Sequence, residues 1–283
     1  MILVTGATGN VGSALTAALC EAGRPARALV RTPESADNLR GLDCEIAIGS
    51  FDDPASLDEA LRGVEAMYLL TPAGPRQVDQ ERSAIDAAAR AGGVRVVKHA
   101  VLGYDGGIGA MGDSHAKSIE HLRASGLPHT ILAPNSFMQN FLRSAALVQQ
   151  QSILPLAGGA AAVSHVDARD VAAVAAHVLA GDGHEGATYQ ITGPEALTYA
   201  EVAAELSTLL GREIRYIDAA PDQARESMVG AGMPEWFADA VDELMASYRE
   251  GNGAEVTDEV EKATGRPARS LSRFFADHRA AFA

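Results

Sequence analysis

The 283-residue chain is poor in cysteine, lysine and aromatic residues. Its two cysteines, Cys20 and Cys44, lack CxxC spacing and are too few for a disulfide scaffold or a zinc cluster. The eight histidines are scattered without HxH or HxxxH spacing, which argues against a histidine-based metal site. The sequence therefore predicts no bound metal.

Positive charge is also scarce, because 23 Lys and Arg residues face 37 Asp and Glu residues, a net charge of −14. No stretch is basic, whereas a surface that follows nucleic-acid phosphates needs clustered Lys and Arg. We therefore expect no nucleic-acid partner and no attraction to an anionic membrane. No apolar run approaches the roughly 20 residues that span a bilayer, and the first residues lack the basic region of a signal peptide. We expect a cytoplasmic protein.

What the chain does contain is a regular alternation of short β-branched runs and helical stretches over its first half. This alternation is typical of parallel strands covered by helices on both faces. We predict an α/β fold, with a Rossmann-type doubly wound parallel sheet over residues 1–134. A smaller, mostly helical lobe is predicted over residues 135–283, of which about 165–192 return to the core. The predicted strands of the sheet are Ile2–Thr5, Ala26–Val30, Glu45–Ile48, Ala66–Leu70, Val94–Val97 and His129–Leu132.

Gly6, Gly9 and Gly12 form a GxxGxxG motif between the opening strand and the first helix. Gly6 permits a tight turn, Gly9 lets the backbone approach a pyrophosphate, and Gly12 lets the helix lie close to the strand. The amides at the helix start then face the phosphates, where the helix dipole favours negative charge. In this context the motif predicts dinucleotide binding; the alternative is a glycine-rich turn without a ligand.

The residue that follows the second strand distinguishes between two nicotinamide cofactors. An acidic residue there would accept hydrogen bonds from the ribose hydroxyls of NAD. This chain has Arg31 and no acid beside it. Because a guanidinium can pair with a 2′-phosphate, Arg31 favours NADPH over NADH; the alternative is a solvated residue at a strand end.

Several segments within residues 1–220 resemble the NmrA-like group of atypical short-chain dehydrogenases/reductases, a group that includes quinone and triphenylmethane reductases and a nitrogen regulator. These segments are Thr5–Gly12, Val30–Pro33, Phe51–Pro54, Ser125–Leu132, Phe137–Asn140, His165–Ala172 and Thr192–Pro194.

The resemblance implies a path for the cofactor along the carboxyl ends of the strands. The pyrophosphate would lie against Gly6, Thr8, Gly9, Asn10 and Val11. Arg31 would meet the 2′-phosphate, and Phe51 the adenine. The ribose would be bordered by Leu70, Thr71 and Pro72, and the nicotinamide end by Pro134, Asn135 and Phe137.

The sequence departs from the Ser, Tyr and Lys that such reductases use. Aligned with the family pattern, Ala100 stands at the Ser position, Met111 at the Tyr position and His115 at the Lys position; a slip of a few residues would bring Ser114 or Lys117 into register instead. The remaining candidate proton donors are His115 and Tyr104. A ketone reduced by hydride needs a positioned acid, whereas a quinone or cationic dye delocalises the product charge.

Two further patterns have a structural and a functional interpretation. Asp170 precedes the apolar run Val171–Val178 and is predicted to cap a helix rather than act as an acid. Trp236 and Phe237 are either part of the core or line an apolar substrate pocket. A helix is also predicted over Ser136–Gln151.

Three functional hypotheses are compatible with these residues. The first is an NADPH-dependent oxidoreductase that transfers hydride to a quinone or related conjugated aromatic acceptor. The second is a tailoring or hydroxylation component of an aromatic polyketide pathway, by analogy with family relatives and with the excess of Arg over Lys that is typical of a GC-rich genome. The third is a non-catalytic NADP(H) sensor with a protein partner. The sequence also leaves a homo-oligomer open.

Overall fold

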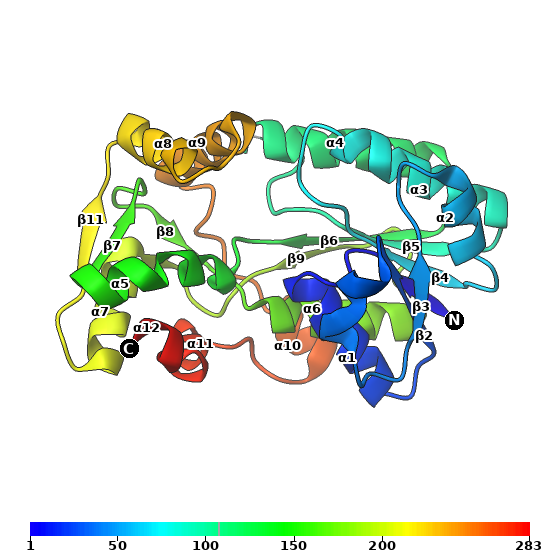
Figure 1. The fold of residues 1–283 in the computed structure, drawn as a ribbon, viewed down its shortest axis with the longest axis horizontal. Helices are drawn as coiled ribbons and strands as arrows, with labels where there is room; N and C mark the ends of the chain where they lie inside the picture. Colours follow the sequence, from blue (N-terminus) through cyan, green and yellow to red (C-terminus); the bar gives the residue numbers. More distant parts are fainter. Residues whose placement is uncertain (107) are drawn as a thin grey trace.

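A parallel sheet is the centre of the computed structural model, which describes residues 1–106 and 108–283. Its seven strands follow the order β3-β2-β1-β4-β5-β6-β9, with every neighbouring pair parallel (Figure 1). The order reverses between β1 and β4, and open α/β sheets bind ligands at such a reversal. The predicted doubly wound α/β sheet is thus confirmed. The strands are β1 (Ile2–Val4), β2 (Ala26–Val30), β3 (Glu45–Ile48), β4 (Ala66–Leu69), β5 (Arg95–His99), β6 (His129–Pro134) and β9 (Thr188–Ile191).

Helices cover both faces of the sheet, since its strands are apolar on both sides. Helices α1 (Asn10–Glu21), α6 (Ala168–Ala180) and α10 (Glu259–Thr264) pack together on one face. Helices α2 (Pro54–Ala60), α3 (Gln77–Ala91) and α4 (Ala110–Ala124) cover the other (Figure 1). None of the helices in the described part of the chain is both long and apolar enough to cross a bilayer.

The lobe beside the sheet has its own core, built around Phe141, Tyr199, Phe274 and Phe275. Two small sheets support it, one of β7 and β11 and one of β8 and β10. The chain also returns from the lobe to the sheet, to contribute α6, β9 and α10. The elements of the lobe are α5 (Ala145–Gln151), β7 (Ile153–Leu156), β8 (Ala162–Val163), β10 (Leu197–Thr198), α7 (Tyr199–Leu210), β11 (Arg215–Asp218), α8 (Pro221–Gly230), α9 (Glu235–Arg249), α11 (Leu271–Asp277) and α12 (Arg279–Phe282).

The segment predicted as one helix over 136–151 is instead two elements. A 3₁₀ helix, η2, spans Met138–Ser144, and α5 follows it. The start of the segment is held outside a helix because Phe137 forms a β-bridge with Val166 and the Met138 amide donates to the Val166 carbonyl. A tertiary contact thus overrides the local helical pattern.

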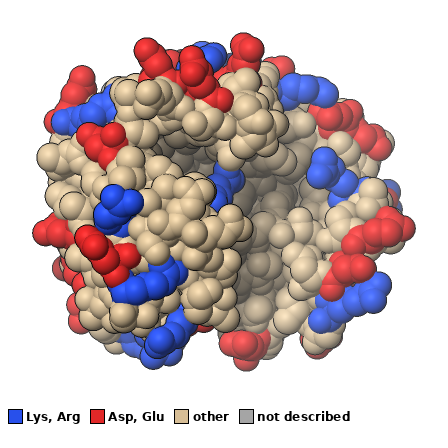
Figure 2. Space-filling model, turned by 60° about the vertical axis from the view of Figure 1, so that its left-hand side comes forward, with Lys and Arg blue, Asp and Glu red and all other residues tan. Residues whose placement is uncertain are grey.

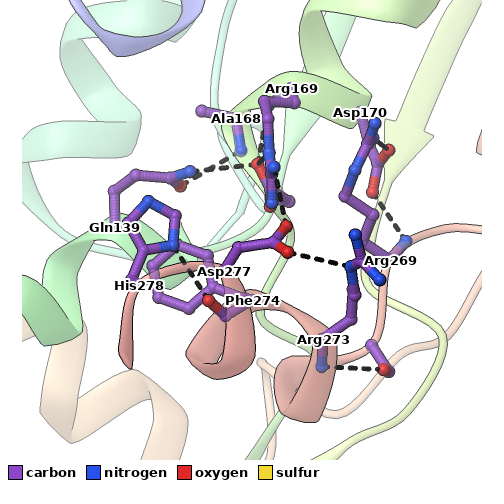
Figure 3. A network of polar contacts seen from close by, with 11 residues as sticks. Gln139, Ala168, Arg169, Asp170, Arg269, Arg273, Phe274, Asp277 and His278 are labelled. Carbon is purple, nitrogen blue, oxygen red and sulfur yellow. Dashed lines mark hydrogen bonds and ion pairs between the residues drawn. The ribbon is translucent and has the colours of Figure 1, made fainter. Parts of the chain in front are cut away.

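A polar network fastens the end of the lobe to the core helix α6 (Figure 3). Asp167, rather than the predicted Asp170, caps α6 by accepting from the Arg169 amide at 2.8 Å. The Arg169 guanidinium bridges Asp167 at 2.6 Å and Asp277 of α11 at 2.9 Å. Asp170, in the first turn of the helix, accepts from the Arg269 amide at 2.7 Å. These carboxylates therefore have structural partners, in line with a structural rather than an acid–base role.

His165 lies within the lobe core, where its ring packs 4.7 Å from that of Phe141 and its Nδ1 is 3.2 Å from the Val163 carbonyl. Burial lowers its pKa from 6.5 to about 4. Below pH 6.5 the unfolded chain takes up a proton at this position and the folded chain does not, so stability is lost as the pH falls.

We expect His165 to make the stability of the folded protein more sensitive to acid, because unfolding takes up close to one proton at this residue. Between pH 6 and pH 4.5, the unfolding free energy should fall about 1.2 kcal/mol per pH unit more steeply in the wild type than in His165→Asn. Urea unfolding at several pH values measures the difference, and parallel pH profiles for the two proteins would refute it.

Candidate active site

The glycine turn between β1 and α1 has the geometry of an anion-binding turn. Gly6 has a φ of 61°, and a Cβ there would approach the Leu70 carbonyl to 3.0 Å. A Cβ on Gly12 would stand 2.1 Å from the Gly6 carbonyl, so only glycine lets α1 lie this close to the turn. No side chain caps α1 and its first turn has no acidic residue. The first helical amides are therefore available to an anionic ligand.

The loop that begins at Arg31 is bonded to the glycine turn. Arg31 follows β2 directly, is exposed, and makes no ion pair or side-chain hydrogen bond within the described residues. The next residue, Thr32, caps a 3₁₀ helix, η1 (Pro33–Leu39). From η1 the Asn38 side chain donates to the Thr8 carbonyl at 3.0 Å. This bond joins the loop after β2 to the glycine turn.

The end of β4 is tied to β1 by a threonine side chain. The Thr5 hydroxyl is 2.9 Å from the Leu70 carbonyl and accepts from the Leu70 amide at 2.8 Å. Leu70 is half-buried, Thr71 is buried and Pro72 is exposed. Phe51 lies after β3 and is half-buried against the core on the α2–α4 face. All of these residues lie at carboxyl ends of strands, on the edge where the sequence predicts the cofactor.

A buried polar cluster lies beneath this edge, and the sequence argument missed it. Lys98 of β5 and Glu81 of α3 are both fully buried, with 2.9 Å between Nζ and Oε1. Thr71 donates to the same carboxylate oxygen at 3.0 Å, and Lys98 Nζ is 3.1 Å from His115 Nδ1. The other oxygen of Glu81 has no hydrogen-bond partner among the described residues. Lys98 follows Val96 and Val97 in β5, and nothing in this local pattern indicates a charge pair with Glu81.

His115 belongs to this cluster. The Gln77 amide nitrogen is 3.3 Å from both of its ring nitrogens. Burial, followed by the neighbouring Lys98 ammonium, lowers the pKa of His115 well below 6.5. Because Lys98 can only donate, it favours the neutral tautomer with a bare Nδ1 and a proton on Nε2. At neutral pH the residue is therefore a hydrogen-bonding group rather than a cationic acid.

His99, Phe137 and Tyr104, which lie near the ends of β5 and β6, are held by neighbouring side chains. Tyr68 OH lies 2.5 Å from His99 Nδ1, and burial lowers the pKa of His99 to about 3. The ring of Phe137 is 6.0 Å from that of His99. Tyr104, the second candidate proton donor, is half-buried against the core on the α2–α4 face.

Asn135, which follows Pro134 at the end of β6, uses its side chain to join the core to the lobe. Its amide nitrogen donates to Ser164 Oγ at 2.8 Å and to the Gly253 carbonyl at 2.9 Å. Its Oδ1 accepts from the Tyr248 hydroxyl at 3.2 Å and from the next backbone amide at 2.8 Å. With these bonds made, Asn135 shapes the edge of the site by positioning the backbone.

Helix α9 of the lobe crosses over three of the strand-end loops. At its start, a Cβ on Gly74 after β4 would come 3.8 Å from the Trp236 ring. In its middle, Glu243 accepts from the Ala110 amide at the start of α4 at 2.7 Å. Near its end, Tyr248 reaches the end of β6. The lobe thus roofs the carboxyl edge of the sheet, and Figure 2 shows a hollow in the face on which the lobe comes forward.

Comparison with known proteins places this arrangement in a family. The chain matches the NmrA-like family over residues 1–279. It belongs to that family. An NmrA-like fold of the same kind is found in the NADPH complex of quinone oxidoreductase QOR2 from Escherichia coli, with a TM-score of 0.91, 26% identity and coverage of 99% of this chain and 100% of that one.

Two curated relatives of this NmrA-like chain are more similar in sequence. The NAD(P)H azoreductase of Xenophilus azovorans is 41% identical over 100% of this chain and 99% of its own length. The (4-alkanoyl-5-oxo-2,5-dihydrofuran-3-yl)methyl phosphate reductase of Streptomyces griseus is also 41% identical, over 100% of this chain and 99% of its own length. Full-length similarity to both covers the turn, the strand ends and the roofing helix alike.

Proposed function

We propose that this chain is an NADPH-dependent reductase that delivers hydride to a quinone or a related conjugated aromatic acceptor. The observation that carries the proposal is the uncapped glycine turn beside the free guanidinium of Arg31. The chain is an NAD(P)H-dependent oxidoreductase, and its full-length relatives are named an NAD(P)H azoreductase and a reductase. What we add is the choice of NADPH and the class of acceptor.

The residues of the site fit the cofactor. The turn at Gly6–Val11 would hold the pyrophosphate, because the α1 amides have no side-chain partner and glycine leaves their approach clear. Arg31 would pair with the 2′-phosphate. When bound, the nicotinamide supplies a hydride, which no protein side chain can do. Leu70 to Pro72 would border the ribose, and Pro134 to Phe137 would shape the nicotinamide end.

The acceptor class follows from the proton donors that the chain offers. Ala100 and Met111 cannot donate, His115 is neutral at pH 7 because burial lowers its pKa, and Tyr104 is half-buried against the core on the α2–α4 face. An acceptor whose product spreads its negative charge over a conjugated system needs no strong acid, since water can protonate it. The relatives named for azo and unsaturated-lactone substrates act on conjugated acceptors too, which supports this class.

Arg31→Ala should separate the two cofactors. Loss of a charge-assisted bond to the 2′-phosphate costs about 1.5–3 kcal/mol, so NADPH affinity should fall by roughly 10- to 100-fold while NADH affinity changes less than about twofold. Calorimetric titration measures both. Arg40→Ala is the matched control, because Arg40 is an exposed arginine on the same loop that pairs with Asp37. Equal losses for both cofactors would remove the 2′-phosphate assignment.

The function itself is tested by following NADPH absorbance at 340 nm with a panel of quinones and azo dyes. We expect acceptor-dependent loss of NADPH. Tight NADPH binding without turnover on any acceptor would overturn the reductase proposal and favour a sensor.

A further inference from the structure

Arg143 and two aromatic residues form a mixed surface at the roofed edge of the sheet. Arg143 lies on η2, six residues after Phe137 at the nicotinamide end of the proposed site. Its guanidinium carbon is 5.5 Å from the ring centroid of Phe237 on α9. Trp236 packs edge-on against Phe237, with 5.6 Å between ring centroids, and remains 38% exposed. The surface thus joins η2 to the start of α9.

The charges around this surface leave Arg143 available to a ligand. Arg143 is exposed and forms no ion pair within the described residues. Two acidic residues of α9 are engaged elsewhere, since Asp239 pairs with Arg225 at 2.6 Å and Glu243 holds the start of α4. An exposed arginine without an acidic partner in the described structure therefore remains on this surface. In a chain of net charge −14, such a cation is a marked local feature.

We infer that the acceptor is an anionic conjugated compound, an aromatic or enone-like system that carries a sulfonate, carboxylate or phosphate group. The conjugated ring stacks on the exposed Trp236, and the anionic group pairs with the Arg143 guanidinium. An arginine held over an aromatic face keeps its in-plane N–H groups free for bidentate pairing with an oxyanion. This inference rests on the proposed function and names the substrate class of the same site.

The test compares 1,2-naphthoquinone with 1,2-naphthoquinone-4-sulfonate in the wild type, Arg143→Gln, and the control Arg215→Gln, an exposed arginine on β11. The two quinones differ in intrinsic reactivity, but this difference is the same for every variant. A change in their kcat/KM ratio between variants therefore reports how the protein recognises the sulfonate. Arg143→Gln should lower kcat/KM for the sulfonate by about 10-fold or more, mainly through KM, and leave the neutral quinone within about twofold. Trp236→Ala should lower both. Equal effects of Arg143→Gln on the two quinones, or none, would overturn the inference.

A binding measurement keeps this result separate from the proposed reaction. Trp236 is the single tryptophan, so quenching of tryptophan fluorescence reports directly on this surface. The sulfonate should quench the wild type with at least 10-fold higher affinity than Arg143→Gln. If the sulfonate binds the wild type more tightly than Arg143→Gln but no NADPH is consumed, the proposed function is refuted and the anion site is retained. If NADPH is consumed but the two proteins bind the sulfonate equally, the anion site is refuted and the proposed function is retained.

Discussion

Gly9→Val is expected to abolish cofactor binding while the protein stays folded. Gly9 precedes α1 with an extended backbone that valine adopts readily, and its Cβ would meet only the Gly6 carbonyl, at 3.4 Å. The added side chain instead obstructs the approach of a pyrophosphate to the first α1 amides. Charge-assisted hydrogen bonds contribute about 1.5–3 kcal/mol each, so losing two should weaken NADPH binding by at least about 100-fold. Calorimetric titration measures the affinity.

The control for this variant is Gly230→Val at the end of α8, where a Cβ meets nothing within 4 Å. Both variants should melt within a few degrees of the wild type, and only Gly9→Val should lose NADPH. Wild-type affinity in Gly9→Val would mean that the pyrophosphate lies elsewhere. Gly12→Val does not give the same information, because its Cβ would collide with the Gly6 carbonyl and disturb the turn itself.

Lys98→Met should strongly destabilise the protein. The substitution leaves Glu81 fully buried with no cation beside it, since its partner in the described structure is Lys98. Removing one member of a buried ion pair typically costs 3–5 kcal/mol, because the remaining charge is no longer compensated. Urea unfolding, analysed as a two-state transition, should therefore show a loss of about that size.

The double variant Lys98→Met/Glu81→Gln tests the cause. Glutamine can still accept from Thr71 but carries no charge, so about half or more of the lost stability should return. If Lys98→Met alone loses less than about 1 kcal/mol, Glu81 is not a buried charge in the folded protein. If the double variant is no more stable than the single one, packing rather than charge holds the cluster.

The parts of the site that sequence could predict are those encoded by local pattern. The glycine turn and Arg31 can be predicted from the sequence, because a turn next to a strand requires particular residues at fixed spacing. The buried cluster of Lys98, Glu81, Thr71 and His115 could not be predicted in this way. Lys98 lies in a short strand beside Val96 and Val97, and Glu81 lies one turn into an ordinary amphipathic helix. Their pairing depends on α3 packing against β5, a long-range contact without a local sequence mark.

The lobe shows the same limit. The helical character of residues 221–249 follows from composition, but its position over the strand ends depends on contacts such as Tyr248 with Asn135, more than one hundred residues apart. Local pattern also failed at residues 136–151, where the bridge between Phe137 and Val166 replaces the first helical turns. Long-range contacts decided both outcomes, a side-chain hydrogen bond in the first and a backbone bridge in the second.

Strand β9 joins the sheet only after the chain has passed through the lobe, and this limits where the protein can be truncated or its parts exchanged. The chain makes six strands, leaves to build β7 and β8 of the lobe, and only then returns to complete the sheet at β6. A fragment ending at residue 134 would lack α6, β9 and α10 and would expose the apolar face that α6 and α10 cover. The sheet with its covering helices and the lobe are therefore one folding unit rather than interchangeable modules. Grafting the lobe of a relative onto this core requires exchanging α6, β9 and α10 with it.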